Sequence, residues 1–179
     1  MVKLYRSTDG AIEYWECWET STHFIVHSGI VGQKGEVKEH NKMENDQVRY
    51  QIEDEMNRAK AAGYSSIDTG LMMQIVIQSR IDGRGSTRDL NRAIAIEDLL
   101  SECLRWTGVG NCDGHDIGSG TLNIFCDVVD GNIGQKIIID CLKQNGQLDG
   151  SVMARRERTG SEEYFVFWPQ GFAGEFHLM

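Results

Sequence analysis

The chain has 179 residues, of which 40% are hydrophobic and 25% charged, so it can bury a core and is not a disordered segment. Its 18 Lys and Arg against 27 Asp and Glu give a formal net charge of -9, which disfavours general affinity for nucleic acid because phosphate is repelled. No stretch approaches the roughly 20 consecutive apolar residues that span a bilayer, and no apolar leader is present, so we expect a cytoplasmic protein that binds no membrane.

The first part of the chain alternates between polar and apolar residues, as a meander of β-strands does. Asp9-Gly10 and the Gly-Gln-Lys-Gly stretch at 32–35 are turn signals. A helix that Asn45-Asp46 can cap follows and ends at Gly63. The predicted strands span residues 3–7, 12–20, 23–31 and 36–42. These elements predict an antiparallel sheet with one helix packed across it.

The second part begins with an apolar run at 71–81, which is long enough for a buried strand. A helix capped by Ser86 or Thr87 comes next, and a glycine-rich loop follows it. Asp130 begins a second helix that Asn145 ends, and Thr159-Gly160 is a hairpin-turn signal. The remaining predicted strands span residues 122–129, 151–158 and 163–168.

These patterns predict an α+β protein with two modules. Residues 1–68 form the sheet with its packed helix, and residues 69–179 form a β-α-β-α-β-β two-layer module in which two helices cover a four-stranded sheet. A single fused domain is the alternative. Both modules are acidic, with 8 basic and 12 acidic residues in the first and 10 and 15 in the second, so a basic partner suits both.

The cysteines indicate neither a zinc site nor a disulfide framework, because they are odd in number, widely spread and never spaced as Cys-x-x-Cys. We expect reduced and mostly buried thiols. His23 and His27 lack a third ligand nearby in the sequence, so we expect no metal ion and no cofactor. The five cysteines are Cys17, Cys103, Cys112, Cys126 and Cys141.

Four motifs in the first 65 residues jointly resemble a WGR domain. They are Tyr5-x-Ser7-Thr8-Asp9-Gly10, Glu13-Tyr14-Trp15-Glu16-x-Trp18, Ser28-Gly29-Ile30-Val31-Gly32-x-x-Gly35 and Ala62-Gly63-Tyr64. The family takes its name from a Trp-Gly-Arg triplet, and the matching residues here are Ser28, Gly29 and Ile30. Only the glycine of the triplet is kept.

In WGR domains of poly(ADP-ribose) polymerases, the surface around this triplet contacts nucleic acid. The chain lacks the aromatic ring and the guanidinium group that suit a base and a phosphate. The resemblance therefore implies a WGR-like scaffold whose old contact face has been retired or redirected. We expect His27, Ser28, Gly29 and Ile30 to contact a partner.

The glycine-rich segment 108–123 resembles a stretch found in uncharacterised bacterial proteins. It is not a phosphate cradle, because it lacks a Walker lysine and leads into a strand, and its acidic spacing does not fit an EF-hand. Its polar residues Asp113, His115, Asp116 and Asn123 either bond to the loop backbone or contact a partner. Catalysis that uses these residues with Cys112 is a third interpretation.

The leading functional hypothesis is an acidic, non-enzymatic protein-binding module that docks a basic protein. By analogy with small acidic bacterial proteins, it acts as a regulator or as an immunity protein of the antitoxin type, whose negative charge speeds association with a basic toxin. One alternative is a nucleic-acid-binding regulator that uses the WGR-like module. The other is an enzyme that uses the glycine-rich loop, which requires its side chains to converge in one cleft.

Overall fold

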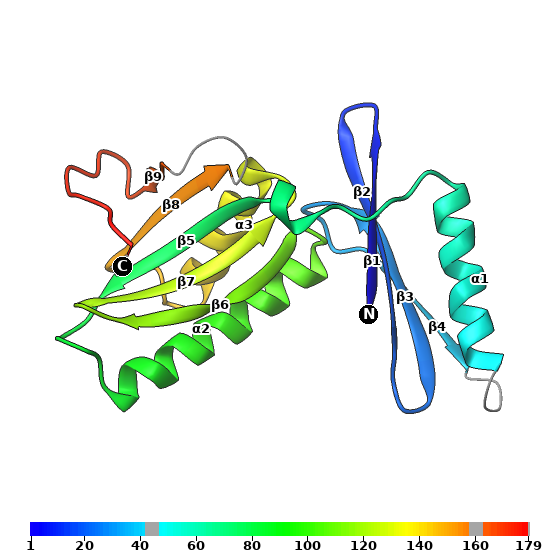
Figure 1. The fold of residues 1–179 in the computed structure, drawn as a ribbon, viewed down its shortest axis with the longest axis horizontal. Helices are drawn as coiled ribbons and strands as arrows, with labels where there is room; N and C mark the ends of the chain where they lie inside the picture. The colour runs from blue at the N-terminus through cyan, green and yellow to red at the C-terminus, as the bar shows by residue number, and fades with distance from the viewer. Residues whose placement is uncertain (42–46, 158–162, 179) are drawn as a thin grey trace. The chain divides into compact units, whose positions relative to one another are not determined.

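The computed structural model describes residues 1–41, 47–157 and 163–178. The fold is α+β, as predicted, with antiparallel sheets of four and five strands and three α-helices among the described residues (Figure 1). The chain divides into two compact units, which are Met1–Ile67 with Trp106–Gly108 and Asp68–Arg105 with Val109–Met179. Within the ranges that the structure describes, no helix is both long and apolar enough to cross a membrane.

The sheet of the first unit is a meander in which each strand pairs with the next, in the order β1-β2-β3-β4. Gly10 turns the chain between the first two strands with a φ of +87°, a conformation that favours glycine. The helix cap predicted at Asn45-Asp46 lies outside the described residues. The elements are β1 (Val2–Thr8), β2 (Ala11–Glu19), β3 (His23–Ile30), β4 (Glu36–Asn41) and α1 (Gln47–Ala61).

The core of the first unit lies between α1 and one face of this sheet. Alternate residues of β2 and β3 are apolar on that face, and Trp15, Cys17, Phe24 and Val26 are buried there with Ala59 of α1. Burying side chains of the larger kinds contributes roughly 1.5–3 kcal/mol each. The period-two pattern of the strands and the helical spacing of α1 therefore fix which faces meet.

The second unit contains a five-stranded sheet in the order β6-β7-β5-β8-β9, with every neighbouring pair antiparallel. Its first six elements follow the split β-α-β pattern, β-α-β-β-α-β. Figure 1 shows α2 and α3 on one face of this sheet. The elements are β5 (Met73–Arg80), α2 (Thr87–Trp106), β6 (Gly110–Gly118), β7 (Thr121–Val128), α3 (Gly131–Gln144), β8 (Ser151–Glu157) and β9 (Phe165–Trp168).

The prediction of a loop at 108–120 is wrong, because most of this segment forms strand β6. The sheet therefore has five strands where four were predicted. Ser119 and Gly120 join it to β7 with φ angles of +47° and +85°, as in the type I′ turn of a tight hairpin. Gly110 has to be glycine because a Cβ there would overlap the carbonyl group of Asp127. The prediction failed because glycine weakens the strand signal, whereas pairing with β7 decides the conformation.

Both helices of the second unit begin at the predicted caps. Asp130 accepts hydrogen bonds from the backbone N–H groups of Asn132 and Ile133, both at 2.9 Å, and so satisfies the first turn of α3. Before α2, the Asp89 carboxylate accepts from the Ser86 N–H at 2.8 Å. These caps explain why the helix starts could be predicted from the sequence.

The expectation that all five cysteines are reduced is wrong for one pair. Cys103 of α2 and Cys141 of α3 form a disulfide, with their Cα atoms 6.7 Å apart. The two residues are 38 positions apart in the sequence, and only the packing of the two helices on the same sheet face brings them together. Spacing rules that look for local cysteine motifs therefore miss the pair. Cys17, Cys112 and Cys126 are free and buried, as expected.

Candidate functional site

The four residues predicted to contact a partner on β3 alternate between the two faces of the first sheet. Ser28 and Ile30 lie on the same face as Val26, which is the face that α1 covers further along the strand. His27 and Gly29 lie on the opposite face. A single partner surface therefore cannot meet all four residues from one face of the sheet.

Ser28, Gly29 and Ile30 nevertheless line one cleft of about 360 Å³, which we call the β3 cleft. Ile30 is 42% exposed and so offers apolar surface to the cleft beside charged residues. Glu36 of β4 pairs with Ser28 across the strands and is exposed. The other lining residues are Glu13, Gln33, Lys34, Gly35 and Tyr64.

The carboxylate of Glu13 is held in place on one wall of the β3 cleft. Arg6 Nε donates to it at 3.1 Å and the Tyr64 hydroxyl donates to it at 2.8 Å. These hydrogen bonds, with that from Arg6 the larger effect, lower the pKa of Glu13 below its usual value. Glu13 is thus charged near neutral pH and largely paired, whereas the Glu36 side chain has no hydrogen-bond or ion-pair partner among the described residues.

Gly29 packs closely against the neighbouring backbone as well as lining the β3 cleft. A Cβ at Gly29 would lie 2.8 Å from the Cα of Gly35 and 3.3 Å from the Tyr14 hydroxyl, closer than ordinary contacts allow. Gly35 is equally confined, by the Ser28 carbonyl and the same Tyr14 hydroxyl. Close approach of the two backbones therefore requires glycine at both positions.

His27, which was predicted to contact a partner, is fully buried, and its side chain is not exposed on the surface of the first unit. Its Nδ1 lies 2.7 Å from Glu16 Oε1 and its Nε2 lies 2.9 Å from the Tyr14 hydroxyl. Glu16 is also buried, with Lys3 Nζ 3.3 Å from its other oxygen. Burial, followed by the charge of Glu16, raises the pKa of Tyr14 to about 12. Hydrogen bonds thus join Glu16, His27 and Tyr14 inside the first unit, and Glu16 also forms an ion pair with Lys3.

The polar residues of β6 do not converge, contrary to what catalysis would require. His115 bonds Glu97 of α2 and so faces the helices, whereas its neighbour Asp116 pairs with Asn123 and faces the opposite side of the sheet. Cys112 faces Cys126, with the two sulfur atoms 3.3 Å apart. Asp113 is exposed at the bulge between Cys112 and Gly114. Because His115 and Asp116 point to opposite faces of the sheet, these described side chains do not meet in one cleft.

Asn123 is fully buried and belongs to a row of amides across the second sheet. Its Nδ2 donates to Asp116 Oδ1 at 2.6 Å, and its Oδ1 accepts from Gln78 Nε2 at 2.9 Å. The same Gln78 nitrogen donates to the carbonyl of His177, at 2.9 Å, so the row also fixes the C-terminal segment. Asn123 therefore holds the structure together and offers no atom to a partner.

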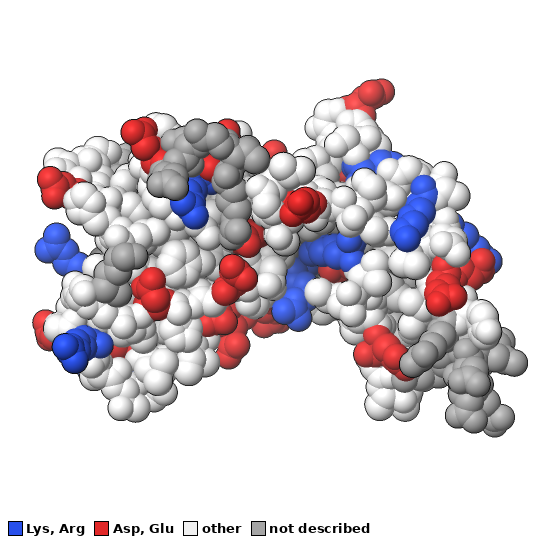
Figure 2. All heavy atoms as spheres, in the orientation of Figure 1, with Lys and Arg blue, Asp and Glu red and all other residues white. Residues whose placement is uncertain are grey.

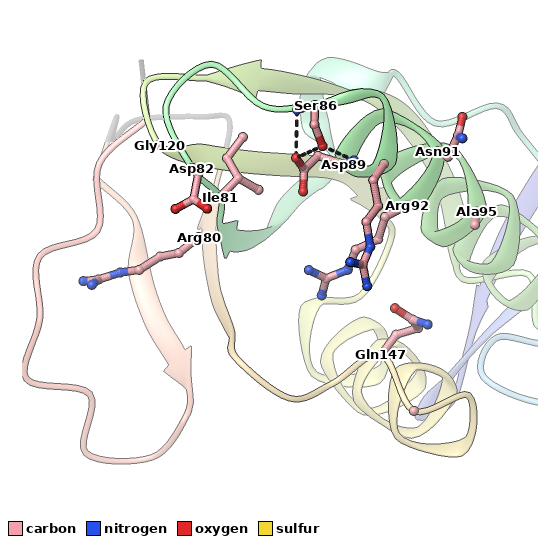
Figure 3. A pocket seen from close by; sticks show the side chains of 12 residues that line it. Arg80, Ile81, Asp82, Ser86, Asp89, Asn91, Arg92, Ala95, Gly120 and Gln147 are labelled. Atoms are coloured by element: carbon pink, nitrogen blue, oxygen red, sulfur yellow. Dashed lines mark hydrogen bonds between the residues drawn. The ribbon is translucent and has the colours of Figure 1, made fainter.

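A second cavity, of about 1030 Å³, lies in the second unit, and no sequence prediction anticipated it. Figure 3 shows it between the start of α2, the turn that contains Gly120 and the connection after α3. We call it the α2 cavity. The available signal was Arg88-x-x-x-Arg92, which places two guanidinium groups on one side of a helix. Such a pair is common on solvated helix faces, so the spacing alone did not indicate a site.

Comparisons with known proteins do not indicate what these sites bind. No family model, no curated protein and no solved structure matches the chain. Among the residues that the structure describes, no group of three or more His, Cys, Asp or Glu side chains could hold a metal ion. The WGR resemblance of the first 68 residues thus stays a prediction.

Proposed function

We propose that the chain is a non-enzymatic protein-binding module whose β3 cleft docks a basic protein partner. The observation that supports this most is the composition of the cleft, in which an exposed Ile30 lies with the charged carboxylates of Glu13 and Glu36. Lys34 is the only Lys or Arg in the lining. The cleft thus combines apolar contact with negative charge.

A Lys or Arg side chain of a partner matches this combination. Its aliphatic stem can pack on Ile30 while its charged head bonds Glu36, which has no partner of its own among the described residues. Asp and Glu side chains lie on the surface of both units in Figure 2, with Lys and Arg between them. The net charge of -9 speeds encounter with a basic protein.

The two alternative functions gain no support from the geometry. Nucleic acid would bring phosphates against Glu13 and Glu36, with the guanidinium group of the WGR triplet replaced by Ile30. Catalysis would need the β6 side chains to converge, and they point to opposite faces of the sheet. An immunity protein remains one form of the proposal, in which the basic partner is a toxin.

Affinity capture from nuclease-treated native lysate tests the proposal with matched variants. Glu36→Lys reverses a charge in the β3 cleft, and Glu53→Lys makes the same change at an exposed site on α1 that does not line the cleft. We expect the wild type and Glu53→Lys to retain the same basic protein in stoichiometric amount, and Glu36→Lys to lose most of it. Mass spectrometry of the eluates gives the amounts.

Three results would contradict the proposal. Equal loss by both variants would mean that only overall charge matters, and an acidic partner would exclude charge complementarity. A partner recovered from untreated lysate but not from nuclease-treated lysate would instead indicate binding through nucleic acid.

A further inference from the structure

The α2 cavity is lined by three arginines that the proposed function does not use. Arg80 comes from the end of β5, and Arg88 and Arg92 come from the first two turns of α2. None of the three guanidinium groups has a hydrogen-bond or ion-pair partner among the described residues. A guanidinium group carries five N–H donors and no acceptor, so three unpaired ones favour an anion.

The two acidic residues in the same lining do not cancel this charge. The Asp89 carboxylate accepts from the Ser86 N–H at 2.8 Å and from the Ser86 hydroxyl at 2.6 Å. These two bonds, more than the charges of Arg88 and Arg92, lower the pKa of Asp89. Asp89 thus caps the first turn of α2. Because three arginines face only two acids, Asp82 and Asp89, the lining has a net positive charge.

The donors in the cavity come from different elements. Figure 3 shows the Arg92 side chain and the Gln147 amide facing the same space, from α2 and from the connection after α3. Arg88 lies one helical turn before Arg92 and shares its side of α2. Arg80 lines the cavity at the end of β5, and its guanidinium group points away from Arg92 and Gln147 in Figure 3. An anion held between Arg88, Arg92 and Gln147 would receive bonds from two sides.

We propose that the α2 cavity binds a small phosphorylated molecule, whose phosphoryl group is held by Arg88, Arg92 and Gln147. Phosphate suits these donors because its oxygens can accept from two guanidinium forks at once. The volume of about 1030 Å³ exceeds what a single inorganic ion fills, so the rest of the molecule occupies the space toward Arg80 and Ile81. The site lies wholly in the second unit and does not depend on the basic partner proposed for the β3 cleft.

Isothermal titration calorimetry with pyrophosphate tests this site on the whole chain. We expect one binding event per chain at low salt, weakened about tenfold or more by Arg88→Gln and by Arg92→Gln, because each removes a charged donor fork. Arg92→Lys keeps the charge without the fork and should fall between the wild type and Arg92→Gln. Arg84→Gln is the matched control, since Arg84 is exposed and does not line the cavity.

The remaining outcomes would overturn the proposal. Absence of binding to wild-type protein at millimolar pyrophosphate would exclude the site. Equal weakening by Arg84→Gln would show attraction to surface charge alone. Citrate that binds as tightly as pyrophosphate, with the same dependence on Arg88 and Arg92, would exclude the assignment to phosphate. Far-UV circular dichroism of each variant checks that the fold is kept.

Discussion

The buried hydrogen bonds from Glu16 through His27 to Tyr14 form an inner polar chain in the first unit. Such a chain is stable only when every member keeps its partner, because an unpaired charge in a low-dielectric interior is costly. Its members come from neighbouring strands, where Glu16 and His27 are directly opposite. The strand register therefore decides whether the chain forms.

Glu16→Ala should reduce the free energy of unfolding by about 3–5 kcal/mol, because it leaves His27 and Lys3 without their carboxylate. Glu39→Ala on exposed β4 is the control and should change it by no more than about 0.5 kcal/mol. Urea denaturation followed by tryptophan fluorescence measures both. Similar losses in the two variants would show that the inner chain contributes little.

Acid should weaken the first unit through Glu13. Its pKa is lowered in the folded protein by hydrogen bonds from Arg6 and then Tyr64, so the ionised form stabilises the fold above the unfolded pKa. This contribution is lost as the pH falls through the lowered pKa, below about pH 4. Glu13→Gln should therefore lose less stability between pH 7 and acidic pH than the wild type does, in urea denaturation at each pH. Identical pH profiles would contradict this assignment.

Single residues also mark the limit of sequence analysis for the sites. The motif comparison found Ser28, Gly29 and Ile30, which line one cleft, because these residues are consecutive in the sequence. It did not place Glu36 or Tyr64 beside them, since only the folded structure brings these two residues to that cleft. His27 was assigned to a partner because strand alternation does not say which face is enclosed.

Secondary-structure elements were predictable where a local signal and the tertiary packing agree. Helices α2 and α3 carry both a capping residue and an apolar stripe, and the strands of the first unit alternate regularly. Strand β6 has no such pattern, because its glycines and polar residues are typical of a loop. Pairing along β7 overrides that preference, and pairing partners far apart in the sequence cannot be read from one segment.

Gly29→Ala tests how β3 packs on the turn that leads to β4. The added Cβ would press on Gly35 and Tyr14, so we expect a loss of about 1–3 kcal/mol in the free energy of unfolding. Ser28→Ala is the neighbouring control and should cost less, since Ser28 is only partly buried and has no packing constraint of this kind. Chemical denaturation compares the two. If Gly29→Ala reduced the free energy of unfolding no more than Ser28→Ala does, the close packing of Gly29 on Gly35 and Tyr14 would be contradicted.

At the scale of the whole molecule, the two units carry different candidate sites. The β3 cleft combines carboxylates with an exposed Ile30, and the α2 cavity has an excess of arginine. Net charge alone predicted a basic partner, but it could not predict a local site of the opposite sign. Charge is informative about encounter between proteins, whereas the local arrangement of side chains decides what binds.

Photo-crosslinking from position 30 tests the central claim most directly, because it reports which surface meets the partner. p-Benzoylphenylalanine replaces Ile30 in one protein and Leu71, which is 69% exposed and does not line the β3 cleft, in the other. In nuclease-treated lysate we predict adducts with one basic protein from position 30 and few from position 71. Equal adducts from both positions, or none from position 30, would contradict docking in the β3 cleft.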